Sequence, residues 1–118
     1  MAHADKRNDP LIIRRRTTFK ANFTFRSPGG ATDFTGKTLV LHVDHPRGEL
    51  FAFATGAAAT PTGSRFYYLD AATGRAALKI SDEDTLLFSF EKHDWWIALL
   101  ETGDVTTIAA GDFEVRKP

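Results

Sequence analysis

The stretch Thr17-Thr18-Phe19-Lys20-Ala21-Asn22-Phe23-Thr24-Phe25-Arg26 decides the fold class of this chain. An apolar side chain stands at every second position from 19 to 25, and polar side chains stand between them. Successive side chains of a β-strand point to opposite faces, so this period of two predicts a half-buried strand. The turn-forming residues Ser-Pro-Gly-Gly at 27–30 then end it.

The same pattern continues to the end of the chain. Turn-forming segments separate further alternating runs at 37–44, 49–55, 65–69, 75–80, 93–101 and 105–115. If the segment that joins the strands at 17–26 and 37–44 is a hairpin, these two strands pair antiparallel. The run at 93–101 is apolar on both faces, which indicates a central strand, and we expect Gly111 to form a β-bulge. Seven or eight short strands at this spacing are typical of an antiparallel β-sandwich or a small barrel.

One helical turn is expected near residues 82–88. Ser81 can cap the start of a helix, and the acids Asp82, Glu83 and Asp84 suit the positive end of its dipole. A calcium loop is the alternative interpretation of the acids. Such a loop needs oxygen ligands at alternating positions and a glycine that turns it, and three consecutive acids lack that pattern.

The length and composition suit one folded domain. We place it at residues 11–118, behind a flexible amino-terminal arm of residues 1–10. The 118-residue chain has no cysteine, which excludes disulfides and cysteine-ligated zinc. It has no apolar signal-peptide region and no run of the roughly 20 apolar residues that a membrane span requires. We therefore expect synthesis in the cytoplasm and no membrane partner.

The formal net charge of zero conceals an uneven distribution. Residues 1–26 carry seven basic and two acidic side chains, a net +5, and the rest of the chain carries eight basic and thirteen acidic side chains, a net −5. Such asymmetry can steer association with an oppositely charged neighbour, including a second copy of the chain. The alternative is a solvated tail followed by charges that protect a strand edge.

The sequence holds no recognisable catalytic motif, such as a Gly-x-Ser-x-Gly elbow or a phosphate-binding Gly-Lys-Ser/Thr loop. His42, Asp44 and His45 lie close enough in sequence to approach a metal, but a solvated histidine beside a turn is the more ordinary arrangement. His93 could be oriented by Asp94, yet no partner nucleophile accompanies them. We expect that the protein is not an enzyme and has no catalytic residue, metal ligand or cofactor.

Two groups of residues suit contacts with a protein partner. The basic triplet at 14–16 could protect a strand edge, contact a partner or grip phosphate, and the neutral net charge favours a protein over nucleic acid. Alternation sends Trp95 and Trp96 to opposite faces, so that one belongs to the core and the other can anchor an interface. We predict a partner interface that contains Arg14, Arg15, Arg16, Tyr67 and Trp96.

The order of the segments resembles that of small virion proteins of tailed phages and prophages. The strand at 16–26 with Asp33-Phe34-Thr35-Gly36 is similar to the family's basic-aromatic strand, turn and Asp-Leu-Thr-Gly motif. Residues 73–81 are similar to the segment before its short helix, and residues 93–99 with 111–115 to its closing hairpin. This chain differs at Trp95-Trp96, where the family has a tyrosine and a small polar pair, and in its long loop at 56–64.

The resemblance covers residues 16–116 and implies an immunoglobulin-like β-sandwich that serves as a virion structural protein, commonly in the tail, baseplate or fibre-attachment region. It implies no catalytic or cofactor residues. We expect a non-enzymatic adaptor in the virion that contacts other virion proteins as a homo-oligomer or as part of a ring. Two alternatives stay open: a carbohydrate-binding module that uses Tyr67, Tyr68 and the exposed tryptophan, and a head decoration or neck protein.

Overall fold

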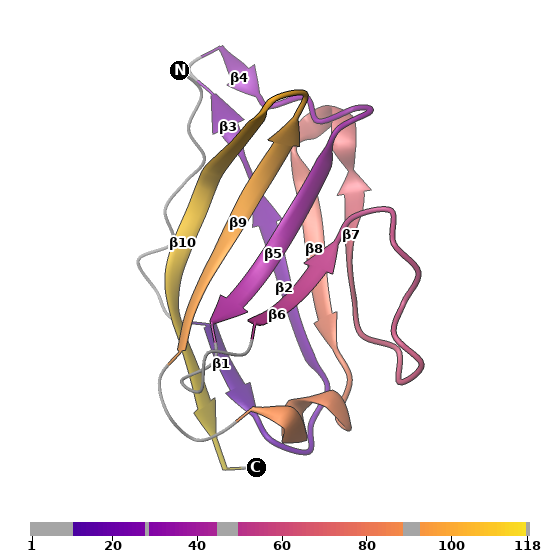
Figure 1. The fold of residues 1–118 in the computed structure, drawn as a ribbon, viewed down its shortest axis with the longest axis vertical. Coiled ribbons are helices and arrows are strands. Elements are labelled where there is room, and N and C mark those ends of the chain that lie inside the picture. Colours follow the sequence, from indigo (N-terminus) through magenta and orange to yellow (C-terminus); the bar gives the residue numbers. More distant parts are fainter. Residues whose placement is uncertain (1–10, 28, 45–49, 89–92, 118) are drawn as a thin grey trace.

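The computed structural model describes residues 11–27, 29–44, 50–88 and 93–117. Two sheets lie face to face, with a small ribbon at one end (Figure 1). Sheet A has the strand order β1 (Leu11–Arg14), β10 (Asp104–Arg116), β9 (His93–Glu101), β5 (Thr38–Asp44) and β6 (Leu50–Ala54). Sheet B has the order β2 (Phe19–Thr24), β8 (Arg75–Ile80) and β7 (Arg65–Asp70). The ribbon pairs β3 (Arg26–Ser27) with β4 (Gly30–Ala31).

The all-β sandwich that the sequence predicts is confirmed. In the part of the chain that the structure describes, eight strands have four residues or more, and β3 and β4 have two each. The helical turn expected near 82–88 is the 3-10 turn η2 (Asp84–Leu87). A second 3-10 turn, η1 (Ala71–Thr73), joins β7 to β8. The predicted arm at residues 1–10 lies outside the described residues.

Two local predictions about strand pairing are wrong. The strands at 17–26 and 37–44 do not form a hairpin, because β2 pairs with β8 in sheet B while β5 lies between β9 and β6 in sheet A. Their apolar faces are instead buried against each other across the sandwich. The register shift in β10 falls between Thr107 and Ala109, and Gly111 stays in register with Trp95. This shift allows both Ile108 and Ala109 to be buried.

The strand β1 has a special place at the edge of sheet A. It runs parallel to β10, whereas the other strand pairs of the described residues are antiparallel. Its side chains Leu11 and Ile13 are buried in the core. The edge strand is therefore an integral part of the sandwich and not a detachable tail.

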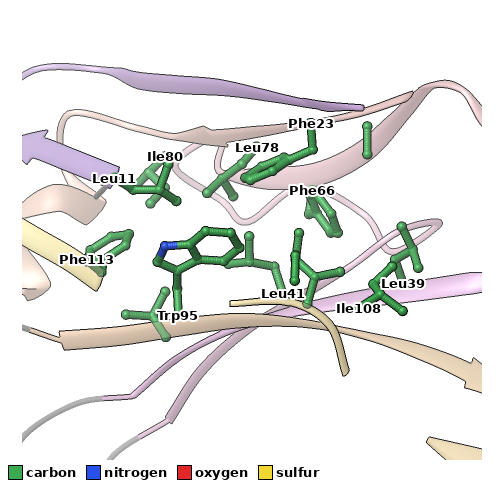
Figure 2. Packing of buried hydrophobic residues seen from close by; sticks show 14 of the residues in the cluster. Leu11, Phe23, Leu39, Leu41, Phe66, Leu78, Ile80, Trp95, Ile108 and Phe113 are labelled. Carbon is green, nitrogen blue, oxygen red and sulfur yellow. The ribbon is translucent and has the colours of Figure 1, made fainter. Parts of the chain in front are cut away.

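The core lies between the two sheets (Figure 2). The faces that alternation predicts to be apolar are the buried ones, as Phe23, Leu41 and Leu78 illustrate. Trp95 projects from the central strand β9 and is fully buried, with its ring centroid 5.6 Å from that of Phe23 in the opposite sheet. Phe66 meets Phe23 edge to face at 6.1 Å, an arrangement that aromatic pairs prefer. Trp95 is thus the core member of the tryptophan pair.

Gly74 follows η1 at a φ of 70°, where the chain packs closely against two backbone carbonyls. A Cβ there would lie 2.6 Å from the carbonyl oxygen of Phe25 and 2.7 Å from that of Thr32. Gly36 has a similar φ of 76°, but its Cβ would meet no described atom within 4 Å.

We predict that Gly74→Ala lowers the free energy of unfolding by at least about 3 kcal/mol, because the backbone must move to make room. Gly36→Ala adds only left-handed backbone strain and should cost about 1–2 kcal/mol. Urea denaturation followed by circular dichroism measures both variants. Equal losses for the two would contradict the close approach at Gly74.

Candidate interaction surfaces

The three predicted interface arginines lie where the chain leaves sheet A for sheet B. Only Arg14 belongs to β1, while Arg15 and Arg16 form the turn that follows, and Arg16 has a φ of 68°. The three side chains therefore do not follow one another along a single strand. The physical reason is that the chain must reverse here in order to start β2 in the other sheet.

Arg15 serves mainly to anchor this turn. Its backbone N–H donates to the carbonyl of Arg116 at 2.9 Å, and its guanidinium Nη2 donates to the carbonyl of Leu86 in η2 at 3.0 Å. The backbone N–H of Arg16 donates to Oγ1 of Thr85 at 2.9 Å. The side chains of Arg14 and Arg16 are exposed. Of the triplet, these two are the ones placed to meet a partner.

Trp96 lies half-buried on the outer face of sheet A, which is the face turned away from the core. The ring of His42 in the neighbouring β5 stacks on it, with ring centroids 4.9 Å apart and planes 17° apart. Burial lowers the pKa of His42 below its ordinary 6.5, so this ring is neutral at pH 7. Ala52 and Ala110 lie in register beside this pair, and Val40 and Ala98 hold the next outward positions away from the aspartates. Together they form an apolar centre on this face.

Tyr67 lies half-buried on the outer face of sheet B. The guanidinium of Arg65 stands over its ring, 3.9 Å from the centroid. The next residue, Tyr68, points the other way, where it stacks on Phe34 at 6.2 Å and donates its hydroxyl to the carbonyl of Lys37 at 2.9 Å. Tyr68 is therefore a structural residue at the rim of the core.

The five predicted interface residues do not form one site. Trp96 and Tyr67 lie on opposite outer faces of the sandwich, and the arginine turn lies at the end of the edge strand β1. The single aromatic platform that a carbohydrate-binding module would need from Tyr67, Tyr68 and the exposed tryptophan is not assembled. This geometry weighs against the carbohydrate-binding alternative.

Strand pairing creates two rows of like charges that were not predicted from the sequence. Each row takes one outward residue from each of three neighbouring strands, namely Asp44, Asp94 and Asp112 in sheet A, and Lys20, Lys79 and Arg65 in sheet B. The members of a row are far apart in the sequence, so no local motif marks them. The period of two shows that each side chain points outward, but only the strand order brings them together.

The histidines do not form the arrangements considered from the sequence. His93 is buried, and its Nδ1 lies 3.1 Å from the backbone carbonyl oxygen of Asp44, whereas Asp94 points to the outer face. His42 stacks on Trp96, and His45 lies outside the described residues. Among the residues that the structure describes, no three metal-binding side chains come together.

One of the acids at 82–84, the half-buried Asp84, anchors the turn. The residue directly before η2 is Glu83, and Ser81 lies two residues further back, where its Oγ accepts a hydrogen bond from the backbone N–H of Asp84 at 3.1 Å. The Asp84 carboxylate turns toward β7, where Oδ2 accepts hydrogen bonds from the hydroxyls of Ser64 and Thr60. Burial by itself raises the pKa of Asp84, but hydrogen bonds from Ser64, Thr62 and Thr60 outweigh it, so the pKa lies below the ordinary 3.8.

A pocket of about 310 Å³ adjoins this carboxylate. Its lining residues are Phe51, Ala52, Phe53, Thr60, Asp84, Leu87 and Phe88. The carboxylate oxygen Oδ2 of Asp84 is already engaged by the hydroxyls of Ser64 and Thr60. The chief role that the contacts indicate for Asp84 is therefore to fasten η2 to the start of β7.

No protein-family model matches the sequence, and no curated protein matches it significantly. The fold is similar to a solved structure, the N-terminal domain of ORF48 of phage TP901-1, with a TM-score of 0.60. The match covers 98% of this chain and 94% of that chain at 11% sequence identity. At this identity the likeness establishes a common fold. No helix among the described residues has both the length and the apolar character to cross a bilayer.

We predict a pH-dependent contribution of Asp84 to stability. Because folding lowers its pKa, the ionised carboxylate stabilises the fold above its ordinary value of 3.8, and this contribution is lost as the pH falls through the lower pKa of the folded state. Asp84→Asn should therefore lower the free energy of unfolding near neutral pH by about 1–2 kcal/mol. The difference from the wild type should shrink in acid, as urea denaturation at a series of pH values measures.

The matched control is Asp82→Asn, which removes a neighbouring exposed carboxylate of the same turn. This variant should change stability little at any pH. Equal effects of the two substitutions would show that the hydroxyl groups around Asp84 contribute nothing specific.

Proposed function

We propose that this protein is a non-enzymatic structural adaptor of a phage virion, in the tail, baseplate or fibre-attachment region. The observation that carries the proposal is the likeness to a domain of a phage protein over nearly the full length of both chains. The order of sequence motifs, which resembles tailed-phage virion proteins, supports it independently of the three-dimensional comparison.

The outer face of sheet A provides a surface for such contacts. Trp96 and His42 form its centre, and at one end Leu100 and Val105, which face each other in register, are 38% and 73% exposed. Tryptophan is enriched among the residues that dominate binding energy at protein interfaces. An apolar centre beside a row of charged side chains also corresponds to the usual core and rim of a protein interface.

The first test is the composition of purified particles. Virions from the strain that encodes the chain should contain it in several copies per particle by quantitative mass spectrometry, and immunogold labelling should place it on the tail. Labelling on the head or neck would instead support the decoration or neck alternative. Absence from particles, with the protein present in the lysate, would contradict a virion role.

The second test uses point variants in a complementation assay. Trp96→Ala should reduce incorporation about tenfold or more, since truncating an interface tryptophan commonly costs 2 kcal/mol or more, roughly a 30-fold change in affinity. The matched control is Leu86→Ala, which truncates an exposed apolar side chain in the turn η2. Deletion of residues 1–16 would be unsuitable, because it removes the core residues Leu11 and Ile13. Normal incorporation of Trp96→Ala would exclude this face as the contact.

A further inference from the structure

The two outer faces of the sandwich carry opposite charges. Asp94 is in register with an aspartate on each side, and Lys79 is in register with a basic residue on each side. Strands lie about 4.8 Å apart, so each row of three charges is about 10 Å long. No member of either row forms an ion pair with another described residue. Like charges placed directly opposite each other destabilise a sheet, and neither row has a compensating partner among the described residues.

The other charged residues of these faces are largely balanced. On sheet A, Glu101 forms an ion pair with Lys37 at 3.2 Å, and Glu114 forms one with Arg116 at 2.9 Å. On sheet B, Arg75 is in register with Asp70. On sheet A, the exposed Arg14 of β1 lies in register with Arg116 and adds positive charge at the edge strand, so the negative charge of this face is concentrated in its row of aspartates. On sheet B, the positive charge is concentrated in the row of Lys20, Lys79 and Arg65.

The rows also lie at the same end of the sandwich. At the lower end of Figure 1, β5 ends and β9 begins in sheet A. At the same end, β8 ends and β2 begins in sheet B. The next outward position along the strands holds an aromatic residue on both faces: Trp96 follows Asp94 on sheet A, and Tyr67 follows Arg65 on sheet B. On both faces, an outward aromatic residue therefore follows the charged row in the same direction.

We propose that copies of this chain associate head to tail, with the outer face of sheet A of one copy on the outer face of sheet B of the next. In this contact the three aspartates face Lys20, Lys79 and Arg65, while the apolar centre around Trp96 covers Tyr67. Charge complementarity of this kind fixes orientation and excludes the wrong pairing. The contact requires only the chain itself, so it does not depend on the proposed virion role.

A symmetric dimer through either face is disfavoured by the same charges. Two copies joined by sheet A with their charged ends together would place one row of aspartates close to the other, and two copies joined in the same way by sheet B would do the same with the basic rows. The complementary arrangement is heterologous, which means that each copy uses two different surfaces.

Sedimentation velocity on the purified full chain tests the association itself. At low salt the wild-type protein should form species larger than a monomer as concentration rises, and added sodium chloride should weaken this association because it screens exposed charges. A monomer at all soluble concentrations in low salt would overturn the proposal.

Two charge reversals identify the surfaces. Asp94→Lys blocks the acidic face and Lys79→Glu blocks the basic face, and each alone should weaken self-association about tenfold or more. An equimolar mixture should regain association, because the intact acidic face of one variant meets the intact basic face of the other, and the two reversed charges again face each other as an opposite pair. A symmetric contact would use only one of the two faces. The variant altered on the other face would then still dimerise by itself, and mixing the two variants would not increase association.

The controls reverse charges away from both rows. Asp104→Lys makes the same change near the turn between β9 and β10, and Arg26→Glu makes the opposite change in the ribbon; both should associate like the wild type. Circular dichroism confirms that each variant is folded. Association that survives both Asp94→Lys and Lys79→Glu, or a mixture of these variants that stays monomeric, would overturn the head-to-tail contact.

Discussion

The contact of Trp95 with Phe23 across the sandwich is the constraint on which the rest of the structure depends. Trp95 projects from β9, the third of five strands in sheet A, and its ring lies 5.6 Å from that of Phe23 in β2 of sheet B. The indole Nε1 has no hydrogen-bond acceptor among the described residues, so placing it in the core costs free energy. Burial of a side chain as large as tryptophan offsets that cost and holds the two sheets together.

The direction of these two side chains also decides what each outer face displays. Because Trp95 points inward, its neighbours Asp94 and Trp96 must point outward, and because Phe23 points inward, Lys20 must point outward. A slip of one residue in either strand would bury the charges and expose the rings. The packing of the core and the pattern of charge on the surface are therefore consequences of one register, and a stable core guarantees the position of both charged rows.

Side-chain alternation was sufficient to predict the strands and their buried faces, and the polar residues at 81–84 predicted the helical turn, because these features depend on neighbours in sequence. The pairing of β2 with β8 could not be predicted in this way, since a short connection after residue 26 fits either a hairpin or a crossing between sheets. The same limit explains Arg16, which leaves the strand because the chain must change sheets there. Trp96 could be placed on a surface from the sequence, but its partner His42 comes from another strand.

Retaining two rows of like charge has a stability cost that an isolated β-sandwich could avoid by exchanging one member of each row for a neutral residue. In a heterologous assembly the same rows become favourable, because each is neutralised by the next copy and the outward aromatic residues are covered together. Such a contact does not end at two copies: it closes into a ring if the rotation between copies divides a full turn, and it otherwise continues as a stack. The rotation depends on the angle at which the strands of the two facing sheets cross, which their twist determines. The twist of the sheets, and not a further binding motif, would then decide the number of copies in the assembly.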